Sequence, residues 1–463
     1  MSARALLIGL TATLSLTTAA TALAQDLGQP GPFAAGFRTV NVTRAAGTTF
    51  TARMWYPAPT ATANAPFDTA ARPAPVVVFG HGFLQTVDRY QSTLAHLATQ
   101  GFIVIASDSE GSLFPSHQNF ANDLSRCFTF VEQQNALASS FLFANADTAR
   151  YGIAGHSMGG GSALLAASTD PRIDAVATLA AAETNPSATA AIAAVSAPVV
   201  LIAGTQDTIV SAAAVTQPMF NAARPVKQYV RIDGAFHCGF EDVSTFGCDS
   251  GSMPRATQLA ATRRMLTRWF RFYLMQDSTL TPQVWPFVGD SAVGFSGFTS
   301  SGISLGTADT ILDIRQGGTA TVQLTVTNSS PRAQTILLSG SAPLLGSLTI
   351  DPPVTPMLAP GETAVIAATI RADLTATRFH LSPRVIAVSG HDGLSMTDRA
   401  IIVYVQCAAD FDVDGSVTPD DLADFIAAYF SPSPQSPSAD FNLDGVTDPD
   451  DLADFIARYF SPC

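Results

Sequence analysis

The sequence predicts a mixed α/β domain with a mostly parallel sheet, followed by a β-sandwich and a small helical repeat. Three observations predict this order. Short apolar runs alternate with helix-like segments up to about residue 280, as in a parallel sheet covered on both faces. Short alternating strands without a convincing helix fill residues 303–405, and an acidic motif occurs twice near the C-terminus. With 463 residues, the chain is too long for one ordinary core.

The first 24 residues have the pattern of an export signal. Arg4 is followed by an apolar stretch over residues 5–16, and Ala22-Leu23-Ala24 is a small-residue cleavage motif. The apolar stretch is too short to span a bilayer. We therefore expect a secreted mature protein that begins at residue 25.

The predicted α/β domain covers residues 25–295. Residues 37–57 are rich in strand formers and predict the first strands. Short apolar runs of the kind buried in parallel sheets follow at 76–79, 102–106, 151–154, 173–179, 198–203 and 228–232. We expect the run at 228–232 to be the last strand of the sheet. Helices are expected at 90–100, 123–138 and 255–275. The domain is therefore predicted to be doubly wound.

A candidate nucleophile, Ser157, lies in the run Gly155-His156-Ser157-Met158-Gly159. This G-x-S-x-G run directly follows a predicted strand and precedes a small-residue helix start, and the sharp turn between them requires small flanking residues. A serine hydroxyl needs a base to take its proton and a third group to orient that base. The run therefore predicts a serine hydrolase if both partners follow in the chain.

The expected chain order of such a site is serine, acid, histidine. Asp207 follows the strand at 198–203, and His237 follows the strand at 228–232. Asp233 is the rival acid because it is nearer to His237 in the chain, but Asp207 is favoured because it ends the right strand. We predict the catalytic set Ser157, Asp207 and His237.

Two backbone N–H groups are expected to bind the oxyanion. One belongs to Met158, and the other to Phe83 in the loop 79–83 after the early strand, where glycines let the backbone approach the substrate. The Phe83 ring is expected in the acyl pocket, although a plain core role is nearly as well supported. His81 and His156 are expected to hold loops by hydrogen bonds.

The segments 79–83, 155–161, 204–207 and 234–238 together resemble the polyesterase–lipase–cutinase group of α/β-hydrolases, which includes the bacterial cutinases and poly(ethylene terephthalate) hydrolases. The resemblance covers about residues 35–280. It implies an α/β-hydrolase fold and an exposed serine site that cleaves carboxylic esters through an acyl-enzyme, with no cofactor for catalysis. Where polyester hydrolases place a tryptophan against the substrate ring, this chain has Glu183, which is expected in the substrate pocket. A carboxylate cannot stack on an aromatic diacid.

Two other functions remain open. One is a carbohydrate esterase of the acetyl-xylan or feruloyl type that acts in polysaccharide degradation. The other is a non-catalytic cell-surface binding protein on a hydrolase fold.

An immunoglobulin-like β-sandwich is predicted for residues 300–406. Residues 320–327 and 363–370 are two of its expected strands, and Gly, Pro, Ser and Asn separate the strands. Nothing in this segment predicts chemistry.

The five cysteines of an exported chain predict disulfides. Cys238 and Cys248 are the closest pair and flank a short loop, while Cys407 and Cys463 bracket the acidic tail. Cys127 is expected to be a buried, inert thiol.

Most of the net charge of −13 comes from residues 407–463, which contain twelve Asp residues and one Arg. This charge has the wrong sign for nucleic acid and the right sign for cations. The run Asp410-Phe411-Asp412-Val413-Asp414-Gly415 recurs as Asp440-Phe441-Asn442-Leu443-Asp444-Gly445. In loops of this pattern, oxygen ligands at alternating positions wrap one calcium ion. The expected ligands of the two ions are Asp410, Asp412, Asp414, Ser416 (backbone), Thr418 and Asp421, and Asp440, Asn442, Asp444, Val446 (backbone), Asp448 and Asp451.

The paired loops resemble the dockerin type I module over residues 408–462. The resemblance implies attachment to a cohesin-like or cell-surface protein. A calcium-stabilised tail without a partner is the alternative.

Overall fold

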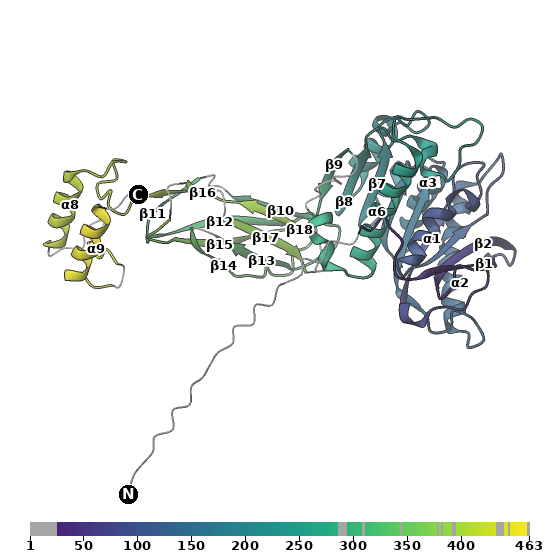
Figure 1. Cartoon of the computed structure of the whole chain (residues 1–463), viewed down its shortest axis with the longest axis horizontal. Helices are drawn as coiled ribbons and strands as arrows, with labels where there is room; N and C mark the ends of the chain where they lie inside the picture. The colour runs from purple at the N-terminus through teal and green to yellow at the C-terminus, as the bar shows by residue number, and fades with distance from the viewer. Residues whose placement is uncertain are drawn as a thin grey trace, which may run out of the picture.

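The computed structural model describes residues 26–285, 294–307, 311–342, 345–376, 379–380, 383–390, 395–431, 439–442 and 445–460. The predicted export signal lies outside these residues, as do the predicted calcium ligand Asp444 and the predicted disulfide partner Cys463. The strand-rich part lies between the α/β part and the last two helices (Figure 1). Within the described residues, no helix is both long and apolar enough to cross a membrane.

The α/β part contains one large sheet with the strand order β1-β2-β4-β3-β5-β6-β7-β8-β9. The six strands from β4 to β8 in that order are parallel, while β1, β2 and β9 run antiparallel to their neighbours. The strands are β1 (Ala34–Thr43), β2 (Thr49–Ala58), β3 (Ala74–Gly80), β4 (Ile103–Ser107), β5 (Ala146–His156), β6 (Ile173–Leu179), β7 (Val199–Gly204), β8 (Lys227–Ile232) and β9 (Phe295–Ser300).

Helices cover both faces of this sheet, and each face has its own core. On β3, Val76 and Val78 pack into the core beneath α2 to α5, whereas Val77 and Phe79 pack into the core beneath α1 and α6. Because both faces are buried, the strands are continuous apolar runs. The helices are α1 (Gln91–Thr99), α2 (His117–Ala136), α3 (Met158–Ala167), α4 (Ala188–Ile192), α5 (Gln217–Ala222), α6 (Arg255–Leu274) and α7 (Thr281–Val284). This arrangement confirms the predicted mixed α/β class and is consistent with an α/β-hydrolase.

The prediction that residues 228–232 form the last strand of the sheet is wrong. The chain returns after α7, and β9 pairs antiparallel with β8 from Ile232↔Phe295 to Lys227↔Ser300. Without β9, the edge of β8 would expose unpaired backbone N–H and C=O groups. The short run of β9 with its internal glycine gave no strand signal by itself.

Residues 303–406 contain strands and no helix in their described part. One sheet has the order β10-β12-β15-β14, and two smaller sheets have the orders β11-β19-β16 and β13-β17-β18. Alternate residues of β12, such as Val322, Leu324 and Val326, are buried in a shared apolar core. The immunoglobulin-like assignment stays a prediction. The strands are β10 (Ile303–Thr307), β11 (Ile311–Arg315), β12 (Thr319–Asn328), β13 (Ile336–Ser341), β14 (Gly346–Asp351), β15 (Thr363–Ala372), β16 (Phe379–His380), β17 (Arg384–Ser389), β18 (Met396–Ala400) and β19 (Ile402–Gln406).

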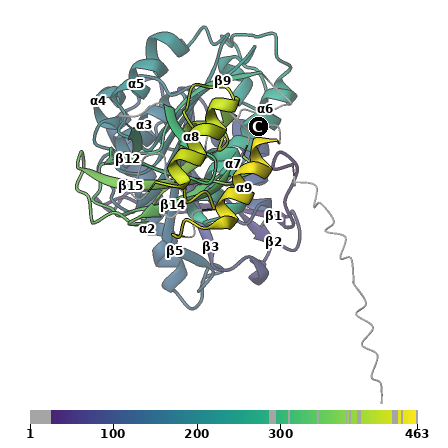
Figure 2. The same cartoon turned by 90° about the vertical axis from the view of Figure 1, so that its left-hand side faces the viewer.

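The acidic repeat folds into two equivalent helices, α8 (Pro419–Tyr429) and α9 (Pro449–Tyr459), which lie in front of the strands in Figure 2. Phe425 of α8 and Phe455 of α9 stack with ring centroids 3.9 Å apart. This small core also contains Phe411 and Phe441, one from each loop. Each repeat therefore contributes equivalent residues to one shared core.

Candidate active site

Ser157 occupies a strained turn between β5 and α3. Its backbone φ of 56° and ψ of −121° place it in a region that few non-glycine residues adopt. The Ser157 N–H donates to the Leu179 carbonyl at 3.0 Å, and its carbonyl accepts from Gly161 and Ala182. The fold holds this strained residue at the carboxyl end of β5, between a buried strand and a buried helix.

The glycines around Ser157 are required by close backbone packing. A Cβ atom on Gly159 would lie 2.2 Å from the carbonyl carbon of Gly80, and one on Gly155 would lie 2.3 Å from the Gly159 oxygen. No side chain fits at either position. The serine turn therefore packs directly against the loop that carries Phe83.

His237 and Asp207 lie together at the ends of two parallel strands. His237 follows β8 in the short 3₁₀ turn η4 (His237–Phe240), and its Nδ1 donates to Asp207 Oδ2 at 2.8 Å. Asp207 Oδ1 accepts the backbone N–H groups of Ile209 and Val210 at 2.9 and 2.7 Å. Both side chains are almost fully buried. Among the described residues, Asp207 and not the rival Asp233 is the carboxylate bonded to His237.

Ser157 and His237 line the same pocket, which has a volume of about 420 Å³. The structure therefore brings together all three predicted catalytic side chains: the serine and histidine at the pocket wall and the aspartate behind the histidine. The residues that line the pocket are Gly82, Phe83, Leu84, Gln85, Thr86, Arg89, His156, Ser157, Ile209, His237, Cys238, Glu241, Thr245, Phe246, Gly247 and Cys248.

The two predicted oxyanion donors lie at this pocket or directly beside it. Phe83 lines it with its ring partly exposed, and Met158 begins α3 directly after Ser157. Within the described part of the chain, neither backbone N–H has a hydrogen-bond acceptor. Both donors are therefore available to a ligand in the pocket.

Buried hydrogen bonds hold the loop that carries Phe83. The Gly82 N–H donates to the Tyr90 hydroxyl at 3.0 Å, and that hydroxyl lies 2.9 Å from His156 Nδ1. His81 bonds the carbonyls of Gly82 and Ser109 at 2.8 and 2.9 Å. Burial holds the pKa of His156 well below its ordinary value, and the neighbouring His237 lowers it further. His81 and His156 thus hold loops, as expected from the sequence.

The predicted place of Glu183 in the substrate pocket differs from its place in the structure. Glu183 is not among the residues that line the pocket. Its carboxylate instead accepts the hydroxyl hydrogen of Thr189 at 2.5 Å, at the start of α4. Partial burial raises the pKa of Glu183, but hydrogen bonds from Thr189, Ser187 and Thr184 together outweigh it and lower the pKa below its ordinary value. The carboxylate is therefore engaged with its own loop.

Of the aromatic residues at the pocket, Phe83 was predicted from the sequence to line it, and Phe246 was not. Phe246 lies in the loop closed by the Cys238–Cys248 disulfide, which the structure confirms with a Cα–Cα distance of 5.6 Å. Sequence analysis also missed Arg89 and Glu241 at the pocket. Glu241 lies four residues after His237, and that spacing was the only available signal.

The other cysteines fit their predictions as far as the described residues allow. Cys127 is free and buried, and burial raises its thiol pKa. Cys407 is disulfide-bonded, and its predicted partner Cys463 lies outside the described residues.

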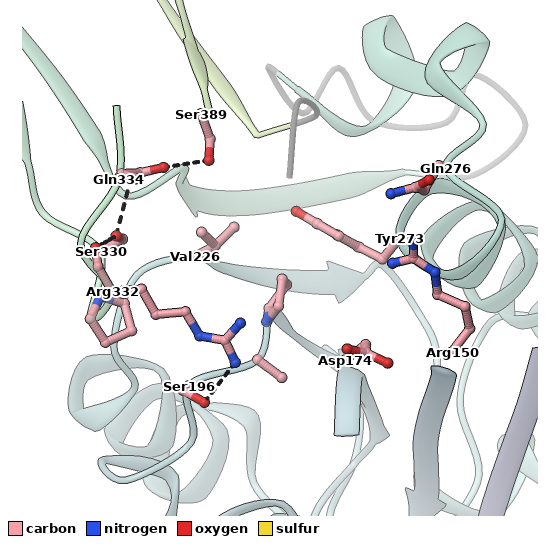
Figure 3. A pocket seen from close by; sticks show the side chains of 13 residues that line it. Arg150, Asp174, Ser196, Val226, Tyr273, Gln276, Ser330, Arg332, Gln334 and Ser389 are labelled. Carbon is pink, nitrogen blue, oxygen red and sulfur yellow. Dashed lines mark hydrogen bonds between the residues drawn. The ribbon is translucent and has the colours of Figure 1, made fainter. Parts of the chain in front are cut away.

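A second cavity of about 200 Å³ lies where the strand-rich part meets the α/β part (Figure 3). Arg150 and Asp174 line it from the α/β part, and Arg332 reaches across to donate to Ser196 at 3.2 Å. The described residues that line it include no histidine or cysteine.

The first acidic loop gathers carboxylates at one place. Oxygens of Asp410, Asp412 and Asp414 lie within 4.8 Å of one another. Asp410 Oδ1 is buried and has no hydrogen-bond partner among the described residues. Thr418 caps α8, and the Asp421 carboxylate accepts three backbone N–H groups of the loop. These hydrogen bonds join the two ends of the loop at Asp421.

The second acidic loop repeats this geometry in its described residues. Asp451 accepts backbone N–H groups of Phe441, Asn442 and Asp448, and Asp448 caps α9. The Gly445 N–H donates to Asp440 Oδ2 at 2.9 Å, as Gly415 does to Asp410. The remaining predicted ligands Ser416 and Val446 lie in the corresponding turns.

Comparison with known proteins finds relatives of the α/β part of the chain. The family model described as PET hydrolase-like matches residues 21–251. Cutinase est2 of Thermobifida alba is 31% identical over 153 residues, which cover 32% of this chain and 48% of that protein. The match thus spans about half the length of this curated relative. In sequence, the N-terminal part of the chain is similar to the PET hydrolase-like family and to this cutinase.

Proposed function

We propose that the α/β part of this protein is a serine hydrolase of carboxylic esters. The observation that carries the proposal is the 2.8 Å bond between His237 and Asp207 at a pocket that also contains Ser157 on its strained turn. The family and relative that match residues of this part support ester cleavage.

In the proposed reaction, the free Nε2 of His237 takes the Ser157 proton as the oxygen attacks the ester carbonyl. Asp207 holds the imidazole in the tautomer whose Nδ1 carries hydrogen. The N–H groups of Phe83 and Met158 bind the resulting oxyanion. The alcohol leaves with the proton from His237. In the second half of the reaction, His237 takes a proton from water, the water oxygen attacks the acyl-enzyme, and the acid is released as Ser157 regains its proton.

Ser157→Ala in the full chain tests the proposal with p-nitrophenyl butyrate as substrate. Activity is expected to fall by at least about 10³-fold, because the nucleophile is lost. The matched control is Ser162→Ala, since the Ser162 hydroxyl is buried near the start of the same helix and has no hydrogen-bond partner among the described residues. Equal activity of both variants would refute the role of Ser157, and no labelling of the wild type by a fluorophosphonate probe would favour a non-catalytic binding protein.

We also propose that the acidic repeat binds calcium. The buried, unpaired Asp410 Oδ1 and the neighbouring carboxylates of Asp412 and Asp414 are hard oxygen ligands that suit this cation. These residues would hold the ion in the first loop, and Asp440, Asn442 and Asp451 would do so in the second. Calcium would stabilise the repeat and takes no part in the proposed ester chemistry.

Calorimetric titration of the full chain with calcium tests this second proposal. We expect two ions per chain, and one in Asp412→Asn. Asp424→Asn is the matched control. Asp424 is exposed on α8, so its substitution removes the same charge outside the loop. No binding, or equal loss in both variants, would refute the proposal. The dockerin-like attachment role and its cohesin-like partner rest on the repeat pattern alone and remain predictions.

A further inference from the structure

Glu241 is a buried carboxylic acid at the pocket that the proposed reaction does not use. It lines the pocket together with Ser157 and His237, and only 2% of its surface is exposed. Among the described residues, its Oε2 has no hydrogen-bond partner, and no ion pair includes the group. A buried polar atom without a partner is costly, so the carboxyl group of Glu241 still requires a hydrogen-bond partner.

The backbone around Glu241 is fixed on both sides. The Glu241 N–H donates to the Cys238 carbonyl at 3.3 Å, and its own carbonyl accepts from the Arg255 guanidinium at 2.6 Å. The next residue, Asp242, donates its N–H to the Arg89 carbonyl at 2.7 Å and accepts the Ser92 N–H at 2.9 Å. The carboxyl group therefore cannot leave the pocket without breaking several contacts.

The charges around Glu241 are mixed. His237 and Arg89 from the pocket and Arg255 from α6 favour its ionised form, while Asp249 opposes it. Burial is the largest effect and raises the pKa of Glu241 to about 7. Near neutral pH the group is therefore present both as a carboxylate, which accepts hydrogen bonds, and as a carboxylic acid, which can also donate one.

We propose that Glu241 hydrogen-bonds a hydroxyl group of the substrate, so that the site selects hydroxylated esters over purely apolar ones. This inference rests on the proposed ester hydrolysis. A hydroxyl both donates and accepts, and it therefore satisfies either form of the carboxyl group. An apolar group in the same place would leave the buried acid unpaired, which sites built on hydrogen bonds reject strongly.

The rest of the pocket fits an ester with both polar and apolar parts. Phe83, Leu84, Ile209 and Phe246 line it with large exposed apolar side chains. Gln85, Thr86, Arg89 and Thr245 line it with polar ones. The substrate class is thus an ester with an alkyl portion and at least one free hydroxyl near the scissile bond.

Matched substrate pairs test the proposal on the full-length protein. Methyl 3-hydroxybutyrate and methyl butyrate differ by a hydroxyl on the acyl side, and 2-hydroxyethyl butyrate and propyl butyrate place it on the alcohol side. Acid release in a pH-stat gives kcat/KM for each ester. We expect the wild type to prefer the hydroxylated ester of at least one pair by about tenfold, the ratio that 1.4 kcal/mol gives.

In Glu241→Leu, this preference is expected to fall by about tenfold, because the variant offers no hydrogen bond. Glu241→Gln keeps a donor and an acceptor and is expected to retain the preference within about threefold. Each ratio compares two substrates on one preparation, so incomplete folding does not change it. No preference in either pair, or an unchanged preference in Glu241→Leu, would overturn the inference.

Failure of the proposed function gives a different result. In that case the wild type hydrolyses none of the four esters faster than Ser157→Ala. If the esters are hydrolysed but Glu241→Leu behaves as the wild type does, only the role of Glu241 fails.

Discussion

The hydroxyl of Tyr90 is expected to support both stability and catalysis, and Tyr90→Phe removes it alone. Tyr90 is 1% exposed. Its oxygen accepts the Gly82 N–H at 3.0 Å and lies 2.9 Å from His156 Nδ1. Gly82 directly precedes Phe83, whose N–H we propose as an oxyanion donor. The substitution therefore releases the oxyanion loop from its buried anchor.

The expected stability loss follows from the two contacts. Each buried polar group left without a partner costs about 1–3 kcal/mol, so the loss of both bonds should lower the free energy of unfolding by about 2–6 kcal/mol. Complete removal of an oxyanion donor costs about 10²–10³ in kcat. A loosened donor should lose part of this, so kcat is expected to fall by about tenfold to a hundredfold, with little change in KM.

Urea denaturation and p-nitrophenyl butyrate kinetics measure the two effects. Tyr151→Phe is the matched control, because it removes the hydroxyl that donates to Glu132 at 3.1 Å far from the pocket. Glu132 can bond to water instead, so this variant should lose only about 0.5–1.5 kcal/mol and keep its kcat. If Tyr90→Phe loses no more stability than Tyr151→Phe, or keeps its kcat within about twofold of the wild type, the reasoning is refuted.

Three further predictions concern the same pocket. Asp207→Asn is expected to lower kcat/KM by about 10⁴, because the wrong imidazole tautomer is held, whereas Asp233→Asn should stay within a few-fold; equal effects would contradict the assignment of the acid. The pKa of Glu241 near 7 lies above its ordinary 4.5, so the folded state holds this proton more tightly and its contribution to stability is lost as pH rises from 4.5 through 7. Urea midpoints of Glu241→Gln measured over this range should therefore decline less than those of the wild type, and an identical decline would refute the shift. Cys238→Ser combined with Cys248→Ser opens a link of sequence separation 10 and should lower the free energy of unfolding by about 2–3 kcal/mol; an unchanged urea midpoint would show that the link does not stabilise the fold.

Local sequence was sufficient to predict those features that depend on residues close together in the chain. The G-x-S-x-G run between a strand and a helix predicts the turn at Ser157, and the buried runs of β3 to β8 are typical of strands covered on both faces. The order of Ser157, Asp207 and His237 follows from strand ends that meet at one edge of a parallel sheet. The close spacing of Cys238 and Cys248 likewise predicted their disulfide.

Tertiary structure decided what depends on distant segments. β9 is a strand only because the open edge of β8 pairs with it. Glu183 lies outside the pocket, where Thr189 binds its carboxylate. Glu241 is buried at the pocket because Arg255 and the Arg89 segment hold its backbone there, and its pKa follows from that burial. The sequence alone predicted the proposed catalytic set of Ser157, Asp207 and His237. Only the packing of separate segments determined which side chains surround it, since burial and hydrogen bonding depend on neighbours that are remote in the chain.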